Sequence, residues 1–327
     1  MENTTKILIK LGSNCNLHCK HCHCSETHPK LNKDIIKYIK DIKGNKRITF
    51  SGGEPFLYWD IIKYIMEELG DILSYKIVTN GTIMDEKKIM FLNQYNCKII
   101  LSYDGENSER DNSISTKYNL FNLLKNVGSI SSLVYNKNMN LQKLSDNIRK
   151  FRINNKLTKN VTNLDGFFPN FIHQTIDNPN KEITKETAKE YCKQFAVLLE
   201  NDMINYKNGN MNDSLGIFYY LATTKFSKKI YNKGFACCNE KMINLVIDGT
   251  ILLCPYGHIK IGDIYNGIDW NLVNSYKPER CKKCELWEVC RNQCIANITD
   301  NECYIFKVIY RHYKKLLKKY YIKEELI

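Results

Sequence analysis

The first half of the chain alternates between short β-rich runs and runs in which apolar residues recur at helical spacing. The expected strands are residues 7–11, 48–50, 75–79, 98–102 and 130–135, with a sixth candidate at 164–171. The expected helices between them are residues 34–42, 61–69, 85–95, 118–127 and 141–151. Repeated strand–helix units predict an α/β fold with a parallel sheet or barrel, in which ligands bind at the carboxyl ends of the strands.

The second half of the chain follows a different pattern. Helices are expected at residues 185–206 and 213–225, and a cysteine-rich region begins after Lys233. Within that region Asp248-Gly249 separates two apolar runs, which predicts a hairpin with a two-residue turn. A basic, aromatic helix is expected at 305–326. We therefore expect a barrel over 1–181, a helical connection packed on it over 182–232, and a small cysteine-rich domain with a C-terminal helix over 233–327.

The composition is that of a folded protein, with 43% hydrophobic and 25% charged residues among 327. No run approaches the ~18–20 apolar residues of a membrane span, and the N-terminus lacks a signal-peptide pattern, so we expect a cytoplasmic protein without membrane contact. Fourteen cysteines in that compartment are expected to be reduced, which favours metal or cluster ligation over disulfides. The net charge of +13 favours a solvated basic surface over a nucleic-acid site.

Three cysteines, Cys15, Cys19 and Cys22, form the pattern C-x3-C-x2-C directly after the first expected strand. Three thiolates are one fewer than a cubane iron–sulfur cluster binds, so one iron would be left for another ligand. Cys24 lies just beyond the three and would complete the set, which would block chemistry at that iron. We interpret Cys24 as a bystander.

Glycine-containing motifs end the next three expected strands. They are Ser51-Gly52-Gly53-Glu54-Pro55, Val78-Thr79-Asn80-Gly81 and Leu101-Ser102-Tyr103-Asp104-Gly105. Each alone is also typical of an ordinary turn that closes a strand. Because the carboxyl ends of parallel strands meet at one edge, all three motifs are expected to gather around the cysteine triad.

This set of motifs resembles the radical S-adenosylmethionine (SAM) enzymes. The resemblance implies a partial parallel (β/α)6 barrel with a [4Fe-4S] cluster on Cys15, Cys19 and Cys22, and His21 takes the place where the family more often has Tyr or Phe. It further implies that SAM completes the cluster and yields a 5′-deoxyadenosyl radical that abstracts hydrogen. The cofactor-binding residues implied are His21, Gly52, Gly53, Glu54, Pro55, Thr79, Asn80, Ser102 and Asp104.

The cysteine-rich region contains C-x2-C-x5-C-x3-C, formed by Cys281, Cys284, Cys290 and Cys294, and an upstream C-x10-G-x4-C from Cys238 to Cys254. It resembles the SPASM domain of radical SAM enzymes that modify peptides and proteins, which implies two auxiliary [4Fe-4S] clusters. By position, the distal cluster is expected on Cys281, Cys284, Cys290 and Cys303. The nearer cluster is expected on Cys254 and Cys294, with either Cys238 or Cys237.

The spare thiol of the pair Cys237-Cys238 is a hypothetical catalytic residue that donates a hydrogen atom to a substrate radical, as peptide epimerases of this superfamily do. The alternative is a buried thiol without such a role.

The predicted function is that of a maturase of ribosomally made peptides, acting under anaerobic conditions by epimerisation or by thioether or carbon crosslinking. Formylglycine formation in a sulfatase is an alternative, and a zinc-ribbon nucleic-acid-binding protein is an alternative of another class. Expected partners are the peptide or protein substrate and a flavodoxin- or ferredoxin-type reductant. Because the first strand begins near Ile7, we expect either that a separate protein binds the leader peptide or that the enzyme recognises the peptide directly.

Overall fold

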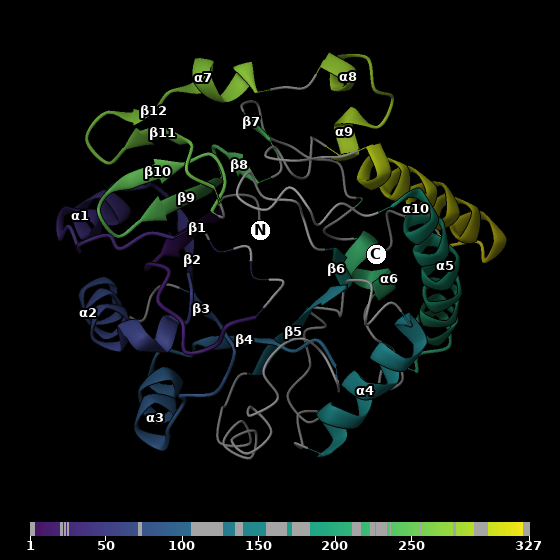
Figure 1. Cartoon of the computed structure of the whole chain (residues 1–327), viewed down its shortest axis with the longest axis horizontal. Helices are drawn as coiled ribbons and strands as arrows, with labels where there is room; N and C mark the ends of the chain where they lie inside the picture. The colour runs from purple at the N-terminus through teal and green to yellow at the C-terminus, as the bar shows by residue number, and fades with distance from the viewer. Residues whose placement is uncertain are drawn as a thin grey trace.

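The computed structural model describes residues 4–19, 22, 24, 26–70, 74–105, 127–134, 140–154, 169–171, 184–210, 217–222, 226, 234–235, 237–255, 257–276, 279–290 and 300–322. Its centre is a curved parallel sheet (Figure 1). The strands are β1 (Thr4–Lys10), β2 (Asn45–Ser51), β3 (Ser74–Thr79), β4 (Lys98–Ser102), β5 (Val127–Val134) and β6 (Pro169–Phe171). They pair in chain order, each parallel to the next, which confirms the predicted partial barrel.

Helices connect these strands on the outside of the barrel (Figure 1). They are α1 (Asp34–Asp41), the short 3-10 helix η1 (Pro55–Tyr58), α2 (Trp59–Leu69), α3 (Glu86–Gln94) and α4 (Leu141–Asn154). Helix α1 buries Ile35, Ile36 and Ile39, as its helical spacing of apolar residues predicts. The expected helix at 118–127 lies outside the described residues except for Val127, which is the first residue of β5.

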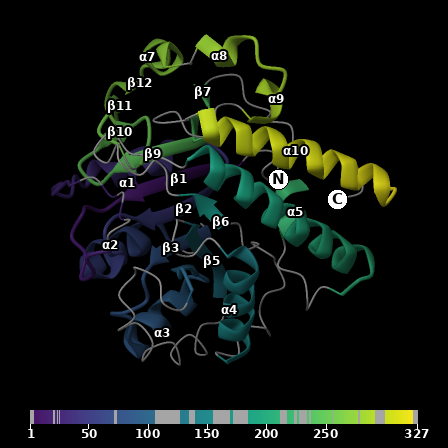
Figure 2. The same ribbon diagram turned by 45° about the vertical axis from the view of Figure 1, so that its right-hand side comes forward.

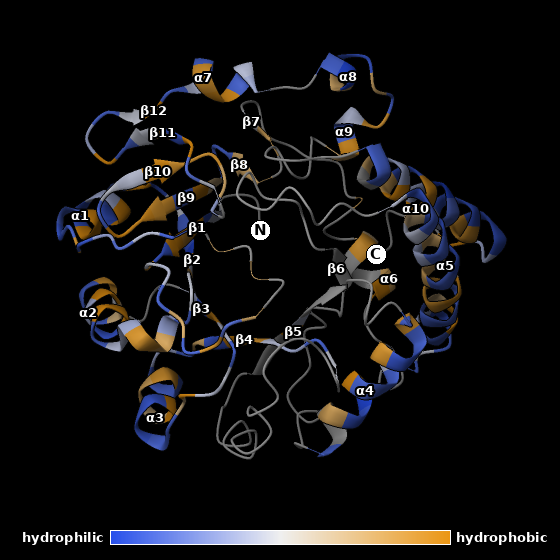
Figure 3. Cartoon of the chain, in the orientation of Figure 1, coloured by the Kyte–Doolittle hydropathy of each residue, from blue (hydrophilic) through white to orange (hydrophobic). Residues whose placement is uncertain are grey.

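Two long helices, α5 (Lys185–Lys207) and α10 (Asp300–Lys319), run side by side (Figures 1 and 2). The outer side of α5 is blue in Figure 3, because hydrophilic residues occupy it. Helix α6 (Ile217–Tyr220) lies within the helix expected at 213–225, of which 213–216 and 223–225 lie outside the described residues. These helices bury an aromatic cluster in which the Phe226 ring contacts Phe306, Tyr310 and Tyr313.

Helix α10 begins at Asp300 rather than at residue 305 and ends at Lys319 rather than at 326. The predicted C-terminal end was wrong because the chain turns at Tyr321, which has a φ of 54°. The N–H of Ile322 then donates to the Leu317 carbonyl oxygen at 3.0 Å, which satisfies a helix-end acceptor.

The C-terminal region extends the barrel sheet. Its strands are β7 (Gly234–Phe235), β8 (Cys238–Asn239), β9 (Met242–Val246), β10 (Thr250–Leu252), β11 (Lys260–Asp263) and β12 (Gly267–Ile268). Strand β9 lies parallel to β1, with Ile7 opposite Ile243, so the described strands form one 12-stranded sheet. Short helices α7 (Trp270–Ser275), α8 (Glu279–Lys282) and α9 (Trp287–Cys290) follow.

The β9–β10 hairpin is present, but its turn is not the predicted one. Leu245 pairs with Ile251, which leaves Ile247, Asp248 and Gly249 in a three-residue loop. Ile247 is fully buried, and Gly249 takes a φ of 94°. The prediction of a two-residue turn was wrong because a left-handed glycine at the end of a three-residue loop closes the hairpin equally well.

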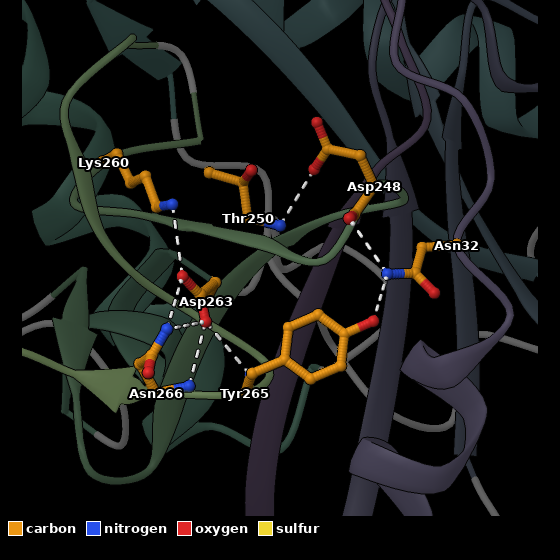
Figure 4. Close-up of polar contacts among 7 residues, drawn as sticks. All are labelled: Asn32, Asp248, Thr250, Lys260, Asp263, Tyr265 and Asn266. Atoms are coloured by element: carbon orange, nitrogen blue, oxygen red, sulfur yellow. Dashed lines mark hydrogen bonds and ion pairs between the residues drawn. The ribbon is translucent and has the colours of Figure 1, made fainter.

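A polar contact joins this hairpin to the start of α1 (Figure 4). The Asn32 side-chain amide donates to the Tyr265 hydroxyl at 3.0 Å and to the Asp248 carbonyl oxygen at 3.4 Å. The Asp263 carboxylate accepts hydrogen bonds from the backbone N–H groups of Tyr265 and Asn266 and thereby shapes the turn that carries Tyr265.

Within the described ranges, no helix combines the length and apolar character needed to cross a bilayer.

Candidate functional site

The cysteine loop and the Ser51–Pro55 motif lie against each other at the carboxyl ends of β1 and β2. The Leu11 N–H donates to the Ser51 carbonyl oxygen at 2.9 Å, and the Gly53 N–H donates to the Gly12 carbonyl oxygen at 2.8 Å. The Glu54 N–H donates to the Asn14 carbonyl oxygen at 2.8 Å. Backbone hydrogen bonds therefore join the residues directly before Cys15 to the glycine turn.

The two glycines of this turn have no room for a side chain. A Cβ on Gly52 would lie 2.4 Å from the Gly12 carbonyl oxygen, and Gly52 has a φ of 149°. A Cβ on Gly53 would lie 2.2 Å from the Asn14 carbonyl oxygen and 2.3 Å from that of Ser13. Glycine is required here because the backbones of the two loops are in direct contact.

The Glu54 side chain is fully buried and links the second motif to the third. One carboxylate oxygen, Oε1, accepts from the Phe56 N–H at 3.0 Å and from the Thr79 hydroxyl at 2.7 Å. The other, Oε2, accepts from the Asn80 N–H at 2.8 Å. These contacts satisfy the buried charge, and they assign Glu54 to positioning the ends of β2 and β3.

Asn80 extends this network to the cysteine loop. Its side-chain Nδ2 donates to Asn16 Oδ1 at 3.0 Å and lies 3.9 Å from Cys15 Sγ. The Leu17 N–H also donates to Cys15 Sγ, at 3.4 Å. Two N–H donors at one sulfur favour a thiolate, the form in which cysteine ligates an iron–sulfur cluster. The donors around Cys15 therefore fit the cluster that the sequence motif implies.

Tyr58 also contacts the cysteine loop, and this contact was not predicted from the sequence. Its hydroxyl accepts from the Asn14 N–H at 3.0 Å. It occupies the space beside Gly12, where a Cβ would lie 2.3 Å from the hydroxyl oxygen. Burial raises the pKa of Tyr58, so the phenol stays protonated. A tyrosine just before the helix expected at 61–69 carries no signal that separates this role from core packing.

The second half of the cysteine loop carries Cys19, Cys22 and Cys24. The Cys22 N–H donates to the Cys19 carbonyl oxygen at 2.9 Å, and His21 lies outside the described residues. Among the described side chains, no three His, Cys, Asp or Glu groups lie close enough together to hold a metal ion. Burial raises the pKa of Cys24 to about 11, so this thiol is protonated near neutral pH; its bystander role stays a prediction.

The fourth motif ends β4 beside helix α4. Asp104 is buried at 1% exposure, and Ser102 is half-buried. The Tyr103 ring stacks on Phe151 of α4 with centroids 4.7 Å apart. Asp104 and Ser102 therefore reach the same edge of the sheet as the cysteine loop, and their predicted contact with the ribose of SAM stays a prediction.

The second cysteine region brings two of its expected ligands near each other. Cys238 is fully buried, and burial raises the pKa of its thiol to about 12, with a smaller contribution from the nearby Cys254. Cys237 and Cys254 are half-buried. Because Cys238 is the buried member of the adjacent pair, Cys237 is the more accessible thiol.

The distal group is arranged around the start of α10. Burial raises the pKa of Cys303 to about 11, and the neighbouring Cys290 and Cys281 add to the effect. The Cys284 N–H donates to the Cys281 carbonyl oxygen at 3.4 Å. Cys294 lies outside the described residues. Cys281 and Cys290 are therefore close enough to Cys303 to affect its pKa, although they are separate from it in sequence.

Comparison with known proteins agrees with this arrangement. Residues 9–158 match the Radical SAM superfamily. The whole chain is 24% identical to the radical SAM cyclopropyl synthase TigE of Paramaledivibacter caminithermalis, of which it covers 76%. It is also 24% identical to a cysteine-type anaerobic sulfatase-maturating enzyme of Clostridium novyi, with 92% of this chain and 90% of that protein covered. In fold it is similar to native anSMEcpe with bound AdoMet and Kp18Cys peptide, with a TM-score of 0.72 at 18% identity, over 99% of this chain and 100% of that chain.

Proposed function

Because the chain belongs to the radical SAM superfamily, we propose that it is a maturase that abstracts hydrogen from a peptide or protein substrate. The reaction is epimerisation or the formation of a thioether or carbon crosslink. The observation that carries this proposal is the contact between the Cys15 loop and the glycine turn at Gly52-Gly53. A second, separate group of cysteines supports it, in which Cys238 lies on β8 and Cys254 follows β10 of the same sheet.

In this proposal the catalytic cluster is held by Cys15, Cys19 and Cys22. SAM is surrounded by His21, Gly52, Gly53, Glu54, Pro55, Thr79, Asn80, Ser102 and Asp104. When bound, the cluster and SAM supply reductive cleavage of the sulfonium to methionine and a 5′-deoxyadenosyl radical. The chain's own residues fix the geometry. Glu54 joins the ends of β2 and β3, and the Asn80 amide reaches from β3 to Cys15.

The C-terminal cysteines bind two auxiliary [4Fe-4S] clusters in this proposal. The distal cluster uses Cys281, Cys284, Cys290 and Cys303, and the nearer one uses Cys254, Cys294 and Cys238. The buried position of Cys238 supports it as the ligand of the adjacent pair, since Cys237 is the more accessible thiol. Cys237 is then the candidate hydrogen-atom donor.

A peptide substrate is supported by the similarity to anSMEcpe, whose structure contains a bound peptide. A flavodoxin- or ferredoxin-type reductant, a separate leader-binding protein and a cytoplasmic location complete the proposal. The similarity to the sulfatase-maturating enzyme of Clostridium novyi over 92% of this chain favours formylglycine formation as a second candidate.

Anaerobic reconstitution tests the cofactors. We expect about twelve iron atoms per chain, four for each of three clusters, and formation of 5′-deoxyadenosine from SAM after reduction. One or two zinc ions without iron, together with no 5′-deoxyadenosine, would contradict the proposal and favour the zinc-ribbon alternative.

Co-expression with short peptides encoded beside the gene tests the substrate. Crosslinking changes the peptide mass, whereas epimerisation leaves the mass unchanged and incorporates deuterium when the reaction runs in D2O. A cysteine-containing sulfatase peptide distinguishes the second candidate. If that peptide alone is modified, the enzyme is a formylglycine maturase.

A further inference from the structure

Asn244 is a buried polar residue at the centre of the second cysteine region. It lies on β9 between β1 and β10, opposite Leu8 on one side and Leu252 on the other. The whole residue is 1% exposed. A polar side chain at such a position is costly unless its hydrogen bonds do something that an apolar side chain does not.

The amide nitrogen of Asn244 contacts backbone carbonyl groups of two separate segments. Its Nδ2 donates to the Cys237 carbonyl oxygen at 3.0 Å, and to the Leu252 and Leu253 carbonyl oxygens at 3.3 Å each. Cys237 is followed by Cys238, and Leu253 is followed by Cys254. A single side chain therefore joins the backbones that carry the upstream cysteines of this region.

The orientation of the amide is determined by these contacts. The other amide atom, Asn244 Oδ1, is buried and has no hydrogen-bond partner among the described residues. Rotating the amide by half a turn would place Oδ1 against three carbonyl oxygens, which repel it. The side chain thus leaves its Oδ1 acceptor unpaired while its Nδ2 donates to the segments that precede Cys238 and Cys254. An unpaired buried acceptor costs stability, so the donated bonds explain why an asparagine occupies this position.

The local structure supplies few alternatives for holding the segments together. Strand β8 is two residues long and meets β9 at one pair, Asn239 opposite Met242. The chain turns after β10, where the Gly257 N–H donates to the Cys254 carbonyl oxygen at 3.1 Å. Between these two ends, the Asn244 amide is the described side chain that contacts both.

We propose that Asn244 is a positioning residue that sets the separation of Cys238 and Cys254, so that both thiolates bind the same auxiliary cluster. This inference rests on the proposed function, because it requires the nearer auxiliary cluster. It predicts that the donor capacity of the side chain at 244, rather than its volume, determines loading of that cluster.

The test uses the full chain with Cys15, Cys19 and Cys22 changed to alanine, so that only the C-terminal cysteines bind iron. This background is reconstituted anaerobically, and iron, sulfide and the electron paramagnetic resonance spectrum of the reduced protein are measured. We expect about eight irons in the background, falling to about four with Asn244→Asp, which keeps the shape but places an acceptor against the three carbonyl groups. Asn244→Ser, which keeps one donor without a charge, is expected to fall between them.

Asn239→Ser is the matched control. Asn239 is also buried and follows Cys238 on β8, but its amide donates at 2.7 Å to the Phe235 carbonyl oxygen on the neighbouring strand β7, so this bond does not join the Cys238 segment to the Cys254 segment. We expect this variant to keep the iron content of the background. Thermal unfolding of each metal-free variant reports folding separately, and Asn244→Ser decides the question if Asn244→Asp does not fold.

Two outcomes would overturn the inference in distinguishable ways. If both Asn244 variants bind as much iron as the background, or if Asn239→Ser loses as much as they do, Asn244 has no specific positioning role and the proposed function stands. If the background itself binds no iron, the auxiliary clusters of the proposed function are wrong and the inference fails with them.

Discussion

The two cysteine regions are held in different ways. The loop that carries Cys15 is fixed from outside, by hydrogen bonds or direct contact from the ends of β2 and β3 and from Tyr58. The segments that carry Cys238 and Cys254 belong to one small hairpin unit and are joined by the Asn244 amide. The first arrangement needs residues from two other strand ends and from η1, whereas the second is nearly self-contained.

This difference fits the roles proposed for the two regions. A site that cleaves a cofactor and directs a radical to one substrate atom requires its ligands to be fixed relative to the whole barrel mouth. An auxiliary cluster requires mainly that its own ligands stay at the correct spacing. Substitutions should therefore have wider consequences near the first region than near the second.

The largest expected effect comes from removing ligands of each region in turn. Cys15→Ala should reduce formation of 5′-deoxyadenosine to the level without enzyme, because the catalytic cluster is lost. The double variant Cys281→Ala and Cys284→Ala should lose iron but still cleave SAM. The SAM cleavage by each variant is measured by chromatographic quantification of 5′-deoxyadenosine after dithionite reduction. If the C-terminal variant also loses all cleavage while remaining folded, the two regions are not separable as described.

A smaller but still large effect is expected from a methyl group in the glycine turn. In Gly53→Ala the new Cβ would meet two backbone carbonyl oxygens at 2.2 and 2.3 Å, so the cysteine loop must move. We expect a loss of cofactor cleavage of roughly 10- to 100-fold, as for other residues that orient metal ligands. Gly257→Ala is the matched variant in the second region, since its Cβ would be 3.8 Å from the nearest atom, Cys254 Cβ. Equal activity losses in the two variants would contradict the difference between the regions.

Tyr58→Phe should have a moderate effect. It removes the acceptor of the Asn14 N–H and leaves the ring packing unchanged, which is expected to cost about 1 kcal/mol of folding stability. Thermal or urea unfolding of the metal-free protein measures it, and a slower reconstitution of the catalytic cluster should accompany it. Tyr265→Phe, in the contact between α1 and the hairpin, is the control that should leave this reconstitution rate unchanged. An unchanged rate in Tyr58→Phe would show that the Asn14 contact does not hold the cysteine loop.

Much of the barrel could be predicted from the sequence because β1 to β4 and their helices have strong local periodicity. The strand at 98–102 was predicted with the bounds that it has in the structure. The motifs at the strand ends were predictable for the same reason, since parallel strands bring their carboxyl ends together. The pairing of β9 with β1 could not be predicted, because it joins residues more than two hundred positions apart and leaves no local pattern.

The residues that hold the two cysteine regions in place could not be predicted for a related reason. Glu54 was predicted as a cofactor contact from its motif, which stays a prediction, but the bonds of its carboxylate to Thr79 and Asn80 within the protein were not predicted. Tyr58 and Asn244 act through contacts with distant backbone groups, which neither residue type nor spacing indicates. The hairpin turn differed because Asp248-Gly249 fits both a two-residue and a three-residue loop.

The smallest expected effect concerns the contact between the two regions, and it depends on pH. The Asp263 carboxylate accepts hydrogen bonds from the backbone and side chain of Asn266 and from Lys260, which lower its pKa from 3.8 to about 2. A carboxyl group whose pKa is lower in the folded state stabilises the fold above its unfolded pKa, and that contribution is lost as the pH falls through about 2. The stabilisation is therefore complete above about pH 5 and declines between pH 4 and pH 2.

Asp263→Asn should accordingly lower the unfolding temperature of the metal-free protein at pH 6, and the difference from the unsubstituted protein should shrink steadily below pH 4. Lys260→Met removes one donor and keeps the backbone donors, so its effect should be weaker at pH 6 and have the same pH dependence. A difference that stays constant from pH 6 to pH 3 would mean that the Asp263 charge does not stabilise the turn. Tyr265 would then reach Asn32 and Asp34 without help from Asp263, and the contact between α1 and the hairpin would not depend on the charge of that carboxylate.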